Sequence, residues 1–232
     1  MKFSSIRKTT LALLSSTAIT VLTFAIAPST ALAQQVWDGD TSDDFSLNTN
    51  WAGDVLPGVG DTAQINDGAS APIVSADQTI NILDLDLGTL TINGATTLTA
   101  TTSTDISGGT LSGAGTLATG TYSQSAGTVN ISTIDASTAF NFPATGILSL
   151  GSVLTGAGVL TKTAAGILIL SGDNSFSGGL SNNAIGSTVI LQHNNAAGIG
   201  TITAGNGTMR QVEVVLAILS PLQVQLLIMQ ME

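Results

Sequence analysis

The 232-residue chain carries 15 acidic residues against 5 basic ones, a net charge of −10, and it contains no cysteine. A surface this acidic repels nucleic acid and anionic lipid, so we expect neither as a partner. The lack of cysteine excludes disulfides and any thiolate metal site.

Residues 1–33 have the organisation of a secretory signal peptide. Basic residues near the start precede a mostly apolar stretch, residues 11–26, and the small residues Ala31 and Ala33 occupy the two positions that a signal peptidase reads. The apolar stretch is short for a membrane span and is interrupted by serine and threonine. We therefore expect cleavage before Gln34 and export of the mature chain.

Residues 34–70 differ in composition from the rest of the mature chain and are predicted to form an N-terminal cap. The segment holds both tryptophans, Trp37 and Trp51, together with Phe45. A stack of β-coils exposes core side chains and unpaired backbone groups at its first turn, and terminal repeats act as caps. We expect these three rings to cover that end of the core.

The same segment carries an aspartate cluster that could bind calcium. Oxygen-rich loops suit that ion, but the loop lacks the ligand register and the distal glutamate of an EF-hand. We therefore predict a solvated loop and no metal site, with calcium as the alternative. The candidate ligands are Asp38, Asp40, Asp43 and Asp44.

Residues 71–207 are predicted to be a series of short strands separated by Gly, Asn, Asp and Ser. In residues 80–88, Leu83, Leu85 and Leu87 alternate with Asp84 and Asp86, the pattern of a half-buried strand. The other expected strands are Leu90–Ile92, Leu98–Thr102, Val129–Ile131, Ile147–Leu150, Val159–Thr163, Ile167–Ser171, Val189–Leu191 and Thr201–Thr203.

An internal repeat decides how these strands pack. Residues 110–120 resemble residues 153–163 at an offset of 43, with Leu111 and Leu117 matching Leu154 and Leu160. That offset corresponds to two turns of a coil with about 20–25 residues per turn. We predict an all-β right-handed parallel β-helix (β-solenoid), with an antiparallel β-sandwich as the alternative.

Residues 160–179, LTKTAAGILILSGDNSFSGG, resemble the autotransporter-associated β-strand repeat of bacterial autotransporter passenger domains. They depart from it at Ala164, where the family often has glycine, and at Phe176, where tyrosine is common. A weaker resemblance to the start of such passengers covers residues 37–67. The resemblance implies a surface-exposed structural or adhesin-like protein, exported through a C-terminal β-barrel, and it supplies no site residues.

Residues 208–232 lack glycine and form an atypical apolar tail interrupted by Pro221. Too few residues remain there for a translocating β-barrel, which is therefore absent from this chain. An out-of-frame tail on a truncated passenger explains the change in composition, and a true capping segment is the alternative. The intact family member would reach the cell surface or the extracellular space, whereas a truncated chain could stay in the periplasm.

Little in the sequence points to catalysis. His193 is the single histidine and Lys162 the one basic residue between Gln34 and Thr208. Asp84 and Asp86 could act as paired carboxylates, although a solvated strand face is the stronger interpretation. We predict no catalytic residues and no cofactor, and a non-enzymatic protein that binds an unidentified cell-surface ligand. The alternative is a secreted polysaccharide-acting enzyme on a β-helix scaffold.

Overall fold

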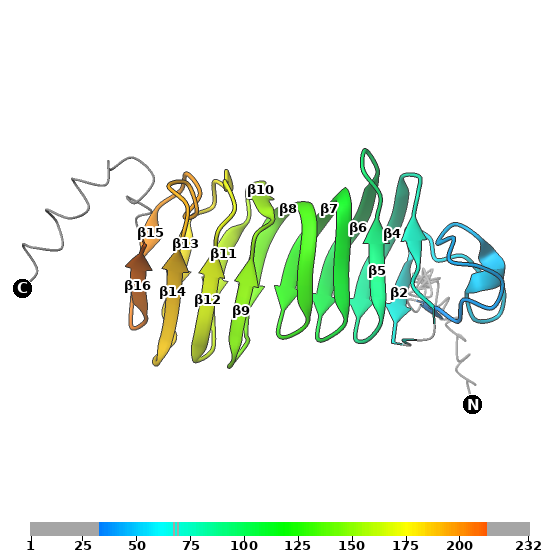
Figure 1. The fold of residues 1–232 in the computed structure, drawn as a ribbon, viewed down its shortest axis with the longest axis horizontal. Coiled ribbons are helices and arrows are strands. Elements are labelled where there is room, and N and C mark those ends of the chain that lie inside the picture. The colour runs from blue at the N-terminus through cyan, green and yellow to red at the C-terminus, as the bar shows by residue number, and fades with distance from the viewer. Residues whose placement is uncertain (1–32, 67, 69, 213–232) are drawn as a thin grey trace, which may run out of the picture. The chain divides into compact units, whose positions relative to one another are not determined.

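The computed structural model describes residues 33–66, 68 and 70–212, which form a parallel β-solenoid of about seven turns (Figure 1). Every pairing between two of its strands is parallel. The predicted parallel β-helix is therefore confirmed, and the antiparallel β-sandwich is excluded.

The strands are short at both ends of the stack and long in the middle, where β6, β7 and β8 bend from one side of the coil to the next. They are β1 (Ala33–Val36), β2 (Asp61–Ile65), β3 (Ile73–Val74), β4 (Gln78–Leu85), β5 (Thr89–Ile92), β6 (Thr97–Ile106), β7 (Thr110–Gln124), β8 (Thr128–Phe142), β9 (Ile147–Leu150), β10 (Val153–Thr155), β11 (Val159–Lys162), β12 (Gly166–Leu170), β13 (Leu180–Asn182), β14 (Ser187–Leu191), β15 (Ile202–Thr203) and β16 (Thr208–Gln211), with one 3-10 turn, Asn48–Asn50.

Successive turns hydrogen-bond to one another in two sheets. The larger follows the order β1-β2-β4-β6-β7-β8-β11-β13-β15, with β10 added on β8 and the pair β3-β5 added on β7. The smaller has the order β16-β14-β12-β9. Because each strand lies directly on its counterpart in the next turn, a residue on one turn has an in-register neighbour on the next.

This register produces a continuous interior column. All of its members but the last are buried, and most are apolar, so each turn covers the core side chain of the turn before it. The last member, Ile202, is half exposed because no later described turn covers it. The column runs Ala63, Leu83, Thr104, Tyr122, Phe140, Leu160, Leu180 and Ile202.

The alternation predicted for residues 80–88 is correct for only part of its length. Leu83 and Leu85 are fully buried, whereas Leu87 is 58% exposed. Strand β4 ends at Leu85, and the backbone amides of Asp86 and Leu87 both donate to Ile65 O. The strand period therefore stops two residues before Leu87, which lies in the following turn.

The internal repeat correctly indicates stacked turns, but it aligns residues that do not pair between those turns. Leu117 pairs with Ile134 and Ile134 with Leu154, so Leu117 and Leu154 lie two turns and 37 residues apart. The tandem similarity instead matches Leu117 with Leu160. From β2 onwards paired residues are separated by 17 to 22 positions. Bulges between strands change the turn length, so a fixed offset cannot follow the register.

The predicted N-terminal cap contains the expected aromatic cluster. Trp37, Phe45 and Trp51 are at most 1% exposed. The ring of Trp51 meets that of Trp37 edge-on at 5.2 Å and that of Phe45 at 4.9 Å, geometries that aromatic rings prefer. The cap is thus a small aromatic core at the start of the coil.

The boundaries of the coil are wider than the composition suggested. Strand β2 lies within residues 34–70 and β1 begins at Ala33, the last residue of the predicted signal peptide, and both strands already belong to the large sheet. At the other end β16, Thr208–Gln211, pairs with β14, so the coil includes four residues that the sequence placed in the apolar tail. Residues 213–232, the rest of that tail, lie outside the described residues, as do residues 1–32.

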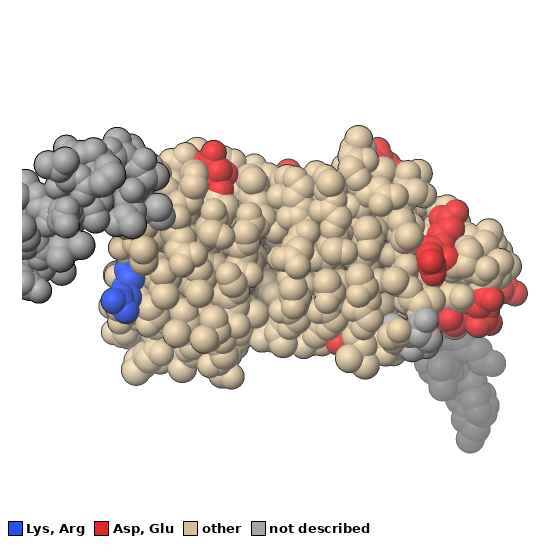
Figure 2. Space-filling view, viewed as in Figure 1, with Lys and Arg blue, Asp and Glu red and all other residues tan. Residues whose placement is uncertain are grey.

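Charged side chains are unevenly distributed along the stack. On the face that Figure 2 shows, most of the acidic side chains lie near the N-terminal end, and one basic patch lies near the opposite end of the coil. Between them the surface is almost free of charge, because its outward positions are mainly threonine, serine, asparagine and glycine.

We predict that Leu168→Ala lowers the free energy of unfolding by about 2–5 kcal/mol, because it opens a cavity in a continuous core. Leu168 is fully buried between Leu148 and Val189 of the adjacent turns. The matched control is Ile169→Ala in the same strand, whose side chain is only half-buried, and it should cost about 1 kcal/mol or less. Denaturant unfolding measures both, and equal losses would contradict the assignment of the two strand faces.

Candidate functional site

A groove of about 270 Å³ lies on the outer surface over β7. Its floor is the small side chain of Ala118 and the backbone of Gly120 in β7, while side chains of β6 and β8 stand on either side. The register places Thr99, Ala118 and Asp135 in one row across three successive turns. The remaining lining residues are Ala100, Thr101, Thr119 and Ser137.

The groove exists because β7 is locally shorter than both of its neighbours. Pairing of β6 with β7 skips from Ala100 to Ser103 while β7 advances from Thr119 to Thr121. Pairing of β7 with β8 shows the same mismatch, since Thr121 pairs with Ala139. Gly120 therefore faces two residues on each side, and this bulge leaves a hollow.

Gly120 is required for the close approach of the backbones at this point. A Cβ atom on this residue would lie 2.4 Å from Thr102 O, well inside van der Waals contact. A side chain here would push the turns apart, so the floor of the groove is backbone.

Asp135 is the only charged residue of the groove. Its side chain is half-buried, and no hydrogen bond to its carboxylate is formed by the residues that the structure describes. An ideal Cβ on Gly156 of the next turn would lie 2.5 Å from Asp135 Oδ1, so glycine there leaves room for the carboxylate. The neighbouring Thr101 donates its hydroxyl proton to Ile80 O or Asn81 Oδ1, both 3.3 Å away.

The carboxylates Asp84 and Asp86, considered above as a possible pair, belong to an acidic row on the outer face of the large sheet. Gln64 Nε2 donates to Asp84 Oδ2 at 3.4 Å and to Asp86 Oδ2 at 3.1 Å, and Asp105 lies in register with Asp84 on the next turn. Partial burial, and then repulsion from Asp86 and Asp105, raise the pKa of Asp84. The carboxylates are held together by one amide and repel one another.

The four calcium candidates do not form a ligand set. Within residues 33–66, 68 and 70–212, no three His, Cys, Asp or Glu side chains lie close enough to hold a metal ion. Asp44 Oδ1 instead accepts hydrogen bonds from the amide and hydroxyl of Ser46. Asp40 and Asp43 are exposed, and Asp38 Oδ1 is buried without a hydrogen bond from the described residues.

Asn50 organises this loop, and sequence reasoning missed it. Its side chain is fully buried, with Oδ1 accepting from the amides of Thr41 and Ser42 at 3.0 and 2.8 Å. Its Nδ2 donates to Ser42 Oγ and to Asp44 O. The side-chain amide of Asn50 thus satisfies backbone groups of the loop.

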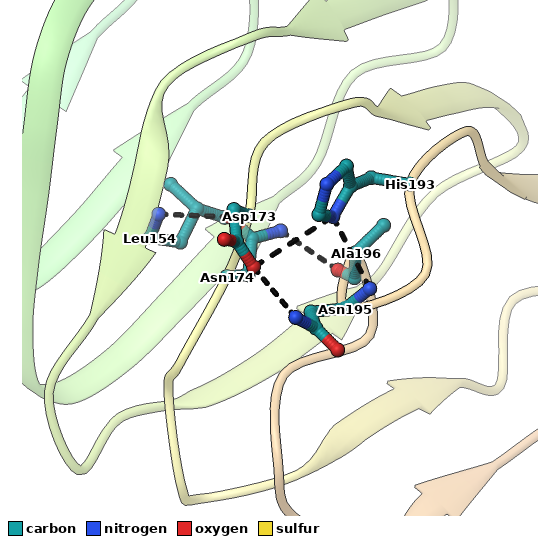
Figure 3. A network of polar contacts seen from close by, with 6 residues as sticks. All are labelled: Leu154, Asp173, Asn174, His193, Asn195 and Ala196. Atoms are coloured by element: carbon teal, nitrogen blue, oxygen red, sulfur yellow. Dashed lines mark hydrogen bonds and ion pairs between the residues drawn. The ribbon is translucent and has the colours of Figure 1, made fainter.

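Asn174 links three successive turns at a break in the strands (Figure 3). Its Oδ1 accepts from Leu154 N at 2.8 Å, and its Nδ2 donates to Ala196 O at 2.7 Å. The side chain is 2% exposed. It therefore replaces, inside the coil, hydrogen bonds that strands make elsewhere.

His193 lies in an exposed loop beside this network (Figure 3). Its Nδ1 is 3.7 Å from Asp173 Oδ1 but accepts a hydrogen bond from Asn195 N at 3.2 Å. Asp173 is held instead by Asn195 Nδ2, at 2.7 Å.

The side chain of Lys162 points into the coil. The one sequence feature consistent with this is its position two residues after the buried Leu160 on the same strand, which places both side chains on the same face. Lys162 is 1% exposed, and its ammonium donates to Ala144 O at 2.6 Å and to Ala164 O at 2.5 Å. Desolvation lowers its pKa. Lys162 ties two loops together and is unavailable to an external ligand.

The predicted cleavage site falls at the start of the described chain. Ala33 and Gln34 are exposed residues of β1, paired with Asp61 and Thr62, whereas Ala31 lies outside the described residues. Cleavage after Ala33 stays a prediction. No helix in the described part of the chain is long and apolar enough to cross a membrane.

Comparison of this chain with protein-family models, with curated proteins and with solved structures gave no match. The resemblance to autotransporter passengers therefore stays a prediction from residues 160–179 and 37–67.

We predict that Asp84→Asn slightly raises the free energy of unfolding at pH 7, by less than about 1 kcal/mol because the site is partly exposed. The pKa of Asp84 is raised above its ordinary value of 3.8, so ionisation destabilises the fold once the pH exceeds the folded pKa. Below pH 3.8 the carboxyl is protonated in both states and the gain should vanish. Asp40→Asn, at an exposed position, is the control in pH-dependent unfolding, and an equal gain there would contradict the prediction.

We also predict that Asn174→Ala lowers the free energy of unfolding by about 2–4 kcal/mol, because it leaves a buried amide and a buried carbonyl without partners. Asn195→Ala is the control, since it removes a bond to an exposed aspartate, and it should change stability by less than about 0.5 kcal/mol. Chemical denaturation measures both. Similar losses in the two variants would show that the Asn174 bridge adds no stability.

Proposed function

We propose that this chain is the N-terminal part of an autotransporter passenger: a non-enzymatic, exported structural protein of adhesin type. The observation that supports it best is the coil itself, in which each turn is a building block that is stable only when stacked. Such a stack holds a long outer surface at a fixed geometry, which is what a protein displayed outside a cell needs to present ligand-binding positions.

The alternative, a polysaccharide-acting enzyme, has less support from the arrangement of charges. Lyase chemistry needs a base beside an acidic cluster, and the described chain has two basic residues. Lys162 is buried, and its neighbour Thr161 lies four turns along the outer column from Asp84. Arg210 lies on the final strand, β16. Neither can reach the acidic row at Asp84.

The export step is the part of the proposal that can be tested most directly. In cells with a general secretion pathway, we expect the mature protein to begin at Gln34, because Ala31 and Ala33 satisfy the signal peptidase. Mass spectrometry of the periplasmic or surface fraction measures the N-terminus. Ala33→Arg is the matched control and should leave the leader attached.

Display requires a translocating β-barrel, which the proposal places outside this chain. A fusion of the chain to such a barrel should therefore appear at the cell surface, where added protease can reach it, while the unfused chain should remain in the periplasm. Retention of Met1 in exported protein, or a cytoplasmic location of both forms, would contradict the proposal.

A further inference from the structure

We infer that the β7 groove binds a positively charged organic group, an alkylammonium or a guanidinium, through the carboxylate of Asp135. The inference deepens the proposed role as a surface scaffold, on which it rests, by naming the chemistry of the ligand. Three features of the groove support it: an uncompensated carboxylate, walls that offer hydrogen-bond acceptors, and a small apolar floor.

Asp135 has no cation or hydrogen-bond donor of its own among the described residues. Lys162 is committed to two carbonyls inside the coil, and Arg210 lies on the last strand. Asp84 and Asp86, by contrast, already accept from Gln64. A charged carboxylate forms charge-assisted hydrogen bonds about twice as strong as neutral ones, so the Asp135 carboxylate can bind an external donor at the groove.

The walls of the groove are polar and present acceptors. Thr101 directs its hydroxyl proton to Ile80 O or Asn81 Oδ1, and Thr119 donates its own to Thr121 O. The oxygen of the Thr101 hydroxyl is therefore left as an acceptor at the groove, whereas Thr119 Oγ1 is buried and already accepts from Thr104 Oγ1 at 3.3 Å. An ammonium has three donors and no acceptor, and a guanidinium has five donors and none. A lining of acceptors around one carboxylate complements either group.

The floor of the groove is small and apolar. Ala118 and Gly120 offer a surface that suits the alkyl stem carrying an ammonium or a guanidinium. The volume of about 270 Å³ suits one such side chain and little more. The hollow is a pocket for a single group on a larger partner or for a small polyamine.

Two other ligand classes fit the groove less well. A metal ion needs several oxygen ligands of high charge, and the groove has one carboxylate. A neutral sugar usually stacks on an aromatic ring, but Tyr122, Phe140 and the other described aromatic side chains are buried in the interior. Both classes serve as outcomes that would contradict the inference.

The test is a nuclear magnetic resonance titration of the full 232-residue chain with n-butylammonium chloride, with sodium chloride at the same ionic strength as the salt control. We expect saturable shifts of the amides of Ala118, Gly120 and Asp135 at millimolar concentrations. Asp135→Asn keeps the shape of the side chain and should weaken binding about tenfold or more, because the charge-assisted bond is lost. Asp105→Asn, on the neighbouring strand but outside the groove lining, should bind within about twofold of the parent chain.

Equal binding by the parent chain and Asp135→Asn, or shifts spread evenly over the aspartates, would overturn the site. Shifts of the groove with methyl glucoside or calcium but not with butylammonium would overturn the ligand class. Ala118→Val, which fills the floor, should also weaken binding, and preserved amide dispersion shows that each variant is folded.

The two sources of the cation are separated by comparing spermidine, a free polyamine, with N-acetyl-lysine amide, which represents a side chain of a partner protein. The tighter ligand identifies the source, and binding of either supports the site. Because the titration uses purified protein, its failure leaves the export experiment unaffected, and failure of export leaves the titration interpretable.

Discussion

Everything in this molecule depends on the in-register hydrogen bonding of one turn to the next. Parallel stacking places each side chain about 4.8 Å from its counterparts above and below. Inside, this turns isolated apolar residues into a continuous column from Ala63 to Leu180. On the outer face, carboxylates that occupy the same register position on adjacent turns, such as Asp84 and Asp105, lie next to each other and repel. Partial burial and the nearby carboxylates of Asp86 and Asp105 raise the pKa of Asp84, which shows that this crowding disfavours its charged form. Hydroxyl and amide side chains avoid that repulsion.

Where the strands are interrupted, buried polar side chains take over the bonding of the backbone. Asn50 does so in the N-terminal loop, Asn174 between three turns, and Lys162 between two loops. Each has partners for its polar atoms in backbone carbonyls or amides, which makes burial of the group tolerable. The coil thus combines regular strands with a small number of buried side chains that hydrogen-bond to the backbone between strands.

The sequence predicted the architecture better than the register. Glycine-bounded apolar runs and a tandem similarity were enough to identify a parallel coil. The alignment of turns was wrong because bulges change the number of residues per turn. The groove could not be predicted at all, because it depends on β7 having one residue where β6 and β8 have two. The roles of Asn50 and Asn174 depend on backbone groups distant in sequence.

Because β7 has one residue where β6 and β8 have two, a change in the length of a single turn can alter the outer surface of the coil. Adding a single residue after Gly120 would match the lengths of β6 and β8 and fill the hollow, while every turn above and below kept its own pairing. A coil built in this way tolerates length changes one turn at a time. A binding pocket on its surface can therefore be created or erased by the insertion or loss of one codon, without redesign of the core.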